Sequence, residues 1–250
     1  MIVKKIDIYR IVVCLCLLMV GKTAGAQEYS GITGMVHVPT AEMAPEGEAR
    51  IGVFFLNREF TPDNLKCEGA KYHTADYFLA ITPFPWIELS YTCTLMKGIS
   101  NAGEVGYNMK DRYFSVKVRP LKEGKWWPAV AIGTQDPGRT IESYEGNLTY
   151  FQNYYVTASK HFVTHGHELG VHLAYRYFRD TTPNRKWKGV AGGITYRPAF
   201  ARNWRAIAEY TGNEVNAAVD CKLWKYLFLQ ASLLNGKYFS GGICFQIQLM

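Results

Sequence analysis

Four histidines lie close together in one short stretch of the sequence. They are His161, His165, His167 and His172, with Ser159 and Glu168 nearby. If this stretch folds as a β-hairpin, His161 and His172 lie on opposite strands and can approach each other. A nucleophile beside a histidine base, held by a third group, is the arrangement that covalent catalysis requires. The histidines therefore raise the question of an enzyme.

No specific signature accompanies these histidines. The sequence has no G-x-S-x-G element, and no His or Cys spacing matches a zinc site. His165-Gly166-His167 is better explained as a turn than as half of a metal site. We therefore expect no enzyme, no catalytic residue, no metal site and no cofactor, and catalysis remains the alternative.

A second set of polar residues stands inside otherwise apolar segments. Its members are Glu88, Lys117, Arg119, Glu168, His172, Arg176, Arg205, Glu209 and Asp220. Mixed charges of this kind can line a path for a hydrophilic or anionic molecule, for which arginine is the better partner of carboxylates. They can also pair with one another and simply fill a narrow interior.

The elements that carry these residues alternate polar and apolar side chains with a period of two. In residues 168–177, one face carries Leu169, Val171, Leu173, Tyr175 and Tyr177, and the other carries Glu168, Gly170, His172, Ala174 and Arg176. Alternation of this kind predicts β-strands with one apolar and one polar face. Twelve segments are predicted as strands: 47–57, 71–82, 86–95, 112–119, 128–135, 150–161, 168–177, 189–198, 203–211, 214–222, 225–235 and 239–249.

The length of these segments favours a membrane barrel over a soluble β-sandwich, which is the alternative. Membrane-spanning strands need about 9 to 11 residues, whereas soluble strands average about five or six. Lipid excludes an open sheet edge, so the last strand must pair with the first. The sequence thus predicts an all-β fold, a transmembrane antiparallel β-barrel of about 12 strands.

Connection lengths suggest an orientation. The stretches 82–85, 197–202 and 235–237 are short, whereas 57–70, 96–111, 136–149 and 179–188 are long and polar. Barrels of this class place short turns in the periplasm and long loops outside. Six tryptophans lie near strand ends, where an interfacial aromatic girdle is expected: Trp86, Trp126, Trp127, Trp187, Trp204 and Trp224.

The N-terminus predicts export. A basic start, an apolar run over 11–20 and the sequence Ala24-Gly25-Ala26 form a signal peptide with a cleavage site near Ala26. We expect a signal peptide at 1–26, an irregular periplasmic or plug segment at 27–46 and an outer-membrane barrel at 47–250. Removing 1–26, with four basic residues and one acidic, lowers the net charge from +7 to +4. This mild surplus lacks basic clusters, so no nucleic-acid partner is expected.

The mature chain keeps four cysteines: Cys67, Cys93, Cys221 and Cys244. None forms a C-x-x-C pair, and three lie in strand-like segments, where cysteine is usually a small apolar residue. Their spacing leaves open whether any of them forms a disulfide.

Several short motifs, in order, resemble one family. They are Gly31-x-x-Gly34-Met35-x-x-x-Pro39-Thr40-Ala41, then Asp111-Arg112-x-Phe114-Ser115-x-Lys117, the stretch 122–136, Tyr155-x-x-Ala158-Ser159-Lys160 and Gly192-Gly193-Ile194-x-Tyr196. This series resembles YjbH-like outer-membrane proteins associated with exopolysaccharide gene clusters, in a short form with room for one barrel.

The resemblance implies a bacterial outer-membrane barrel that takes part in export, passage or surface handling of polysaccharide. The implied partners are outer-membrane lipid, polysaccharide and other envelope secretion proteins. Two alternatives remain: a barrel enzyme that modifies envelope lipid or glycan, and a structural or adhesin-like barrel.

Overall fold

The computed structural model describes residues 27–60, 66–137, 151–179 and 186–249. The predicted signal peptide at 1–26 lies outside these residues, as does most of the predicted loop at 136–149. Among the described residues, no helix is long and apolar enough to span a membrane.

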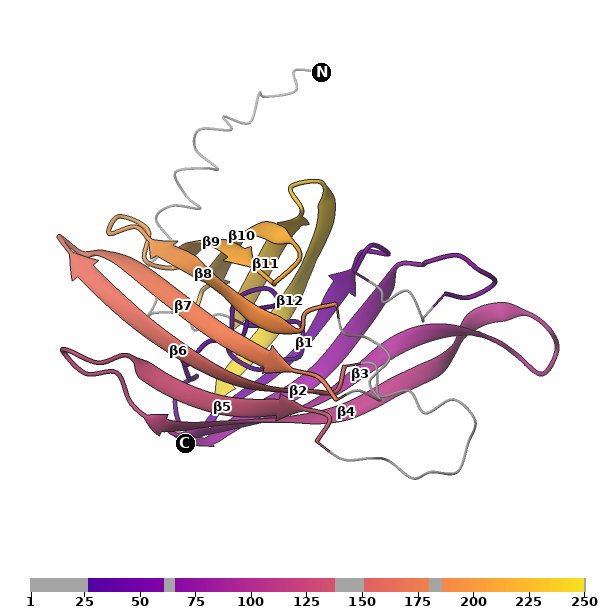
Figure 1. Cartoon of the computed structure of the whole chain (residues 1–250), viewed down its shortest axis with the longest axis horizontal. Helices are drawn as coiled ribbons and strands as arrows, with labels where there is room; N and C mark the ends of the chain where they lie inside the picture. The colour runs from indigo at the N-terminus through magenta and orange to yellow at the C-terminus, as the bar shows by residue number, and fades with distance from the viewer. Residues whose placement is uncertain (1–26, 61–65, 138–150, 180–185, 250) are drawn as a thin grey trace, which may run out of the picture.

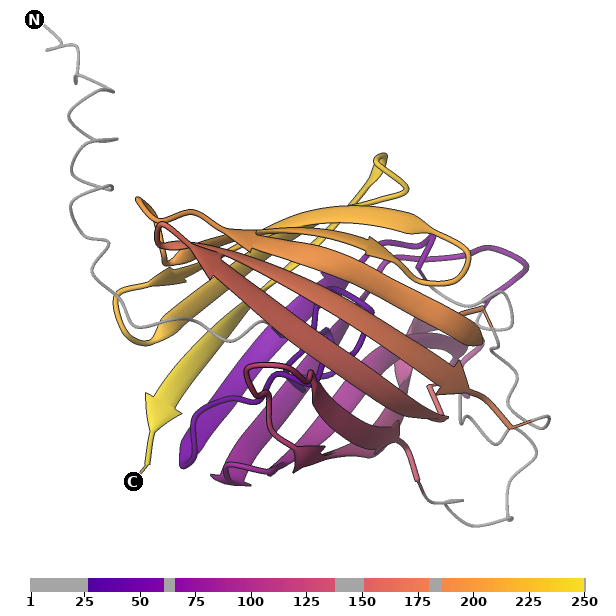
Figure 2. The same cartoon turned by 60° about the vertical axis from the view of Figure 1, so that its left-hand side comes forward.

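Twelve strands form one closed antiparallel barrel (Figures 1 and 2). The strands are β1 (Glu48–Leu56), β2 (Thr74–Phe84), β3 (Ile87–Ile99), β4 (Val105–Leu121), β5 (Ala129–Gln135), β6 (Asn153–Thr164), β7 (His167–Tyr177), β8 (Gly189–Arg197), β9 (Trp204–Tyr210), β10 (Val215–Leu223), β11 (Leu227–Leu234) and β12 (Tyr238–Gln248). Each strand pairs with its neighbours in sequence. The predicted fold class is confirmed.

The first and last strands close the barrel. Glu48 of β1 pairs with Gln248 of β12, and the register runs on to Phe55 opposite Gly241. Small residues allow this seam to form, because a Cβ on Gly242 would lie 2.5 Å from the ring of Phe54. The described strands therefore leave no sheet edge unpaired, as the sequence argument required.

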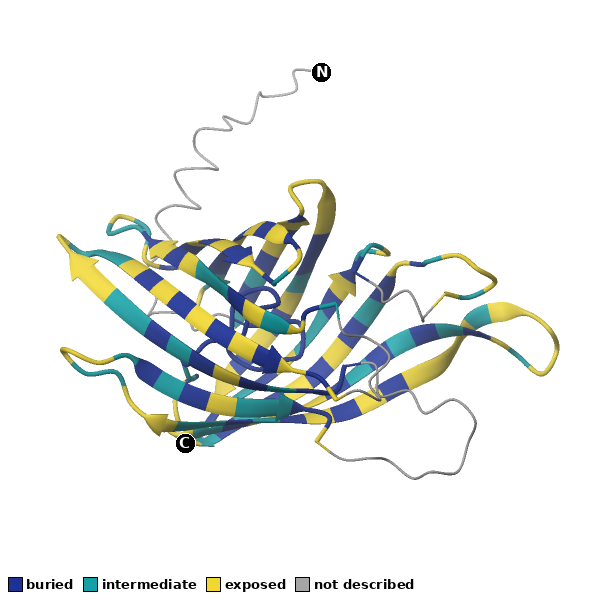
Figure 3. Ribbon diagram, viewed as in Figure 1, coloured by how far each residue is buried: buried dark blue, intermediate teal, exposed yellow. Residues whose placement is uncertain are grey.

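The two faces of the wall differ in polarity, and the stripes of Figure 3 show the alternation along each strand. In β7, the residues from Leu169 to Tyr177 alternate between exposed and buried. Every strand exposes large apolar side chains outward: Ile51, Leu79, Tyr91, Phe114, Ile132, Val156, Leu173, Ile194, Tyr210, Val219, Leu233 and Ile243. The buried residues between them are mostly polar. The wall is thus apolar on its outer face and mostly polar on its inner face, the reverse of a soluble protein.

The barrel has two unlike ends. We call the end where β1 starts and β12 finishes the terminal end, and the opposite one the distal end. The terminal end carries the connections at 85–86, 122–128, 165–166, 198–203 and 224–226, and the distal end carries the rest.

Two predicted connections differ from the structure. The predicted loop at 96–111 is mostly strand, because β3 runs to Ile99 and β4 starts at Val105. This hairpin projects beyond the barrel at the distal end (Figure 1). The short turn at 235–237 also lies at the distal end, opposite the side that its length predicted.

Tryptophans mark the terminal end. Trp86, Trp126, Trp127, Trp204 and Trp224 are exposed there, on or beside strand ends. Trp187 is different: its side chain is buried at the distal end, so it does not belong to a girdle. Cys67, Cys93, Cys221 and Cys244 are free thiols.

The segment 27–46 lies inside the barrel, where it forms irregular turns drawn in indigo (Figures 1 and 2). Residues 27–41 are all buried, and exposure increases from Glu42 toward Pro45 and Glu46. We call residues 27–44 the plug. The plug replaces the apolar core that a soluble domain of this size would have.

Candidate functional site

Glu88, on the inner face of β3, is the main anchor of the plug. Its carboxylate accepts hydrogen bonds from the backbone N–H of Thr33 (2.9 Å) and of Ala44 (2.6 Å). Lys117 lies 2.9 Å from the same carboxylate and donates to the carbonyl oxygens of Thr33 and Glu42. Both charged side chains are fully buried. A buried ion pair is stable only when its remaining polar atoms are also bonded, and the plug backbone supplies those bonds.

Glu209, on β9, holds the middle of the plug. Its carboxylate accepts hydrogen bonds from the backbone N–H groups of Val36, His37 and Val38, at 3.0 to 3.2 Å. Asn216 of β10 donates to the same carboxylate at 2.9 Å. Three successive N–H groups converging on one carboxyl group form a small anion-binding turn, to which β9 contributes the carboxyl group.

Aromatic rings close the distal side of the plug. Tyr29 and His37 of the plug meet Phe60 and Trp187, which lie in two distal connections. The His37 ring centroid is 4.0 Å from that of Phe60 and 5.5 Å from that of Trp187. We call these four residues the aromatic cluster. It packs the plug against these two distal connections.

Burial changes the acid–base behaviour of two plug residues. Burial raises the pKa of Glu28 to about 7, although Arg176 acts in the opposite direction. Burial, reinforced by the charges of Arg176 and Lys186, holds the pKa of His37 well below its usual range. His37 is therefore neutral at physiological pH.

A cavity of about 320 Å³ opens at the terminal end, between the plug and the wall. Its lining includes Arg119, Lys122, Glu123, Glu168 and Arg197. Arg197 forms an ion pair with Glu168. The cavity therefore offers both charges to a solute that approaches this end.

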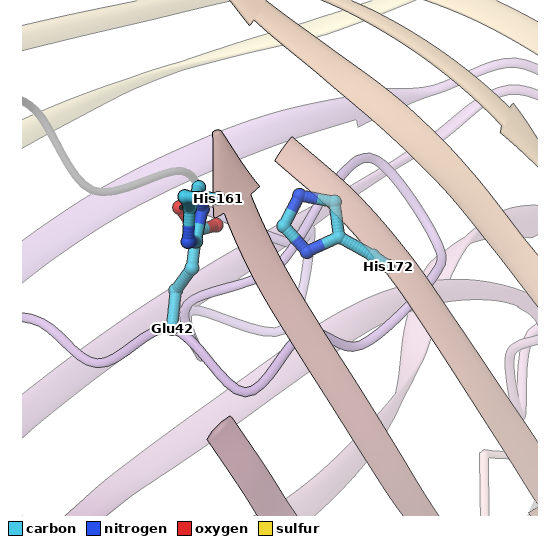
Figure 4. A group of neighbouring side chains, drawn as sticks. All are labelled: Glu42, His161 and His172. Carbon is cyan, nitrogen blue, oxygen red and sulfur yellow. Dashed lines mark hydrogen bonds and ion pairs between the residues drawn. The ribbon is translucent and has the colours of Figure 1, made fainter. Parts of the chain in front are cut away.

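Glu42 and His161 lie at the same cavity, and His172 lies behind them in the wall (Figure 4). Nδ1 of His161 is 2.7 Å from a carboxylate oxygen of Glu123, and its Nε2 is 3.3 Å from Oε1 of Glu42. The other oxygen of Glu42 lies 3.3 Å from Arg205, which also forms an ion pair with Asp220. The imidazole of His161 thus bridges two carboxylates.

Both carboxylates are held in the charged form. Burial opposes ionisation of Glu42, yet the hydrogen bond from His161 and the charge of Arg205 hold its pKa well below the usual range. Burial also opposes ionisation of Glu123, but its hydrogen bonds with His161 and Lys160 lower its pKa. The pair is therefore anionic at neutral pH.

Ser159 and His172 form a close pair beneath the plug. The Ser159 hydroxyl lies 2.9 Å from Nδ1 of His172 and also accepts a hydrogen bond from the backbone N–H of Ala41. Both side chains are almost completely buried under the plug. Ser159 also belongs to the lining of the terminal cavity, and its hydroxyl anchors the backbone of Ala41.

The structure brings most of the predicted lumen residues together. Those buried on the inner face are Glu88, Lys117, His172, Arg176, Arg205, Glu209 and Asp220. Arg119 and Glu168 are half-buried at the terminal cavity. Sequence reasoning missed Glu42 and Glu123, because both lie in irregular segments where no periodicity assigns a face. It also missed Arg50, which lies 3.4 Å from Glu88.

The plug and the strands that hold it lie in a part of the chain that matches a known family. The family model YjbH, described as "Exopolysaccharide biosynthesis protein YbjH", matches residues 26–188, which include the plug and the first seven strands. The chain belongs to the YjbH family. The predicted family resemblance is therefore confirmed.

One relative is a protein of Escherichia coli (strain K12) named "Uncharacterized lipoprotein YjbH". It is 31% identical over 156 residues, which are 60% of this chain and 19% of the relative. This YjbH-family chain thus spans about a fifth of the length of the relative it matches.

Two solved structures align with most of the chain at low identity. A KdgM porin has a TM-score of 0.46 at 10% identity, covering 81% of this chain and 99% of that one. OprB of Pseudomonas putida, in its low-pH structure, has a TM-score of 0.32 at 9% identity, covering 80% and 90%. The barrel of this YjbH-family chain is established by its own strand pairing.

Proposed function

We propose that this chain is a non-enzymatic outer-membrane barrel that takes part in the export or surface handling of polysaccharide, with its lumen closed by the plug at rest. The observation that carries the membrane assignment is the reversed polarity of the wall, which exposes large apolar side chains on every strand. Such a surface is stable against lipid and is a strong aggregation liability in water.

The polysaccharide assignment rests on the family. The matching model is described as an exopolysaccharide biosynthesis protein, and the match includes the plug and its anchor Glu88. The polar inner face and the charged terminal cavity are suited to a hydrated, charged polymer. The E. coli relative is named a lipoprotein, which agrees with a place in the envelope.

Passage through the barrel requires the plug to move. Glu88 and Glu209 hold it by backbone hydrogen bonds, and the aromatic cluster closes its distal side. The proposal therefore includes a closed state at rest and an open state that depends on displacement of the plug.

Conductance across planar lipid bilayers tests the closed state. We expect the purified chain to be silent, and the double variant Glu88→Ala, Glu209→Ala to conduct, because both plug anchors are removed. Glu104→Gln, in an exposed distal connection, is the control and should stay silent. Heat-dependent migration in gels shows whether each variant is folded. A folded double variant that never conducts would contradict a displaceable plug.

The polysaccharide role is tested in the cell that encodes the chain. Deletion of the gene should reduce surface polysaccharide, and re-expression should restore it. Ser159→Ala should restore it equally well, because the serine anchors Ala41 and performs no chemistry. Unchanged polysaccharide in the deletion strain would refute the role, and failure of Ser159→Ala with a folded barrel would favour catalysis.

A further inference from the structure

Three side chains of metal-ligating type meet at the terminal end, and nothing in the proposed function requires them to do so. Glu42 comes from the plug, His161 from β6 and His172 from β7 (Figure 4). One ligand atom from each lies within 4.8 Å of the others. Two imidazoles and one carboxylate are the ligand set of a zinc site with an open position.

Glu123 orients the nearer histidine. Its carboxylate is bonded to Nδ1 of His161, so Nε2 of the ring is directed toward Glu42. Metal-bound histidines almost always have such a partner on the second nitrogen, which fixes the tautomer and raises the basicity of the ligand. His161 therefore already has the partner on its second nitrogen that is typical of a metal ligand.

Gly170 allows the two imidazoles to lie close together. It pairs with His161 across the β6–β7 ladder. A Cβ at this position would lie 2.8 Å from Nε2 of His172 and 3.1 Å from Cδ2 of His161. The same Cβ would also collide with Oγ1 of Thr195, so a side chain at this position would disturb the two rings, which lie edge to face with centroids 5.5 Å apart.

Charges of both signs surround the cluster. Lys160 pairs with Glu123, and Arg205 pairs with both Glu42 and Asp220. The terminal cavity reaches both Glu42 and His161, so an ion has a way in. His172 would exchange its hydrogen bond to Thr195, which is 3.1 Å from Nε2, for a metal bond.

We propose that Glu42, His161 and His172 bind a divalent transition-metal ion of the zinc class, which fastens the plug to β6 and β7. Imidazole ligands favour zinc over calcium and magnesium, which prefer oxygen. The ion would link the plug to the wall at its terminal end. This inference is independent of the polysaccharide proposal, because it concerns the purified barrel alone.

Zinc binding by the chelator-treated chain in detergent micelles tests the site. Titration against a chromophoric chelator should give one zinc equivalent, without displacement by calcium or magnesium. His161→Gln and Glu42→Gln should each abolish that equivalent, and these mild changes at partly exposed side chains keep the barrel folded. Glu123→Ala should weaken binding about 10- to 100-fold, as expected for a residue that positions a ligand.

His167→Ala is the matched control. His167 lies at the start of the same hairpin strand, is bonded to Tyr196 and is not part of the cluster. It should bind zinc as the unmodified chain does. Equal zinc binding by His161→Gln, Glu42→Gln and the unmodified chain would place the ion elsewhere and overturn the proposal, as would the absence of binding in the unmodified chain.

A second readout follows the plug itself. The backbone N–H groups of Ala41 and Ala44 are bonded to Ser159 and Glu88. Zinc should slow hydrogen exchange at these two amides in the unmodified chain and leave it unchanged in His161→Gln. Zinc that binds but leaves plug exchange unchanged would refute the fastening role.

Discussion

At the scale of single residues, the inner face of the barrel is organised by carboxylates that accept backbone N–H groups. Glu88 and Glu209 each accept hydrogen bonds from backbone N–H groups of the plug. Glu42 is itself a plug residue, and its carboxylate binds Arg205 of the wall. An irregular segment has many backbone donors without partners, and burying such donors costs free energy. The charged residues of the inner face therefore serve first to satisfy the plug.

His37 gives the plug a predictable sensitivity to acid. Its pKa is lowered in the folded state, so the unfolded chain takes up a proton below about pH 6.5 and the folded chain does not. Stability is therefore lost as pH falls below that value. This loss amounts to at most about 1.4 kcal/mol per pH unit. His37→Phe should remove it, because phenylalanine does not titrate. The ring packing on Phe60 and Trp187 is kept in this variant.

Urea unfolding at pH 7.5 and pH 5.5 measures this effect. The quantity to compare is the difference in unfolding free energy between the unmodified chain and His37→Phe at each pH. Glu28, with its raised pKa, acts in the opposite direction in both proteins and cancels in that difference. A difference that does not change with pH would mean that His37 does not resist protonation.

At the scale of elements, the plug and the strands depend on each other through a few buried ion pairs. Lys117 of β4 and Glu88 of β3 are opposite each other in the ladder, and both also bind plug backbone. Removing either Lys117 or Glu88 leaves the other charge buried with fewer hydrogen bonds. The resulting loss of stability is larger than the net contribution of the ion pair itself.

A double-mutant cycle measures this coupling. Glu88→Ala and Lys117→Ala should each lower the free energy of unfolding by about 3 to 5 kcal/mol. The double variant should lose clearly less than the sum, because neither Glu88 nor Lys117 is left without the other. Glu104→Ala, in an exposed connection, should have no measurable effect. Additive losses would show that the two residues act separately.

The sequence predicts the wall far better than it predicts the plug. Period-two alternation assigned Lys117, Arg176 and Glu209 to the inner face because a strand can turn only one of two ways. No comparable rule sets the register of an irregular segment, so the sequence does not connect Glu42 with His161. The residues 96–111 read as a loop because they include Gly98, Asn101 and Gly103, but only 100–104 lie between β3 and β4.

At the scale of the whole molecule, the barrel has a polar interior and an apolar outer surface. The outward face of β7 at Leu173 is apolar at mid-strand, whereas Val163 is exposed near the terminal end of β6. The cost of a charge on such a face depends on its depth in the bilayer. Depth dependence therefore distinguishes a membrane-embedded wall from a soluble one.

Arginine substitutions test this arrangement. In lipid vesicles, Leu173→Arg should lower the free energy of unfolding by about 2 to 4 kcal/mol, because the charge falls near the bilayer centre. Val163→Arg should cost only about 0 to 1 kcal/mol near the interface. Urea titrations of both variants give the comparison. Equal, small costs at both sites would contradict a lipid-facing wall.

The seam between β1 and β12 has a consequence for how the molecule is assembled. The plug is the earliest part of the described chain, and the wall around it closes only when the last strand pairs with the first. Every strand is therefore synthesised after the object that it encloses. Glu88, Glu209 and Ser159 therefore all bind backbone groups of a segment that precedes their own strands in the chain.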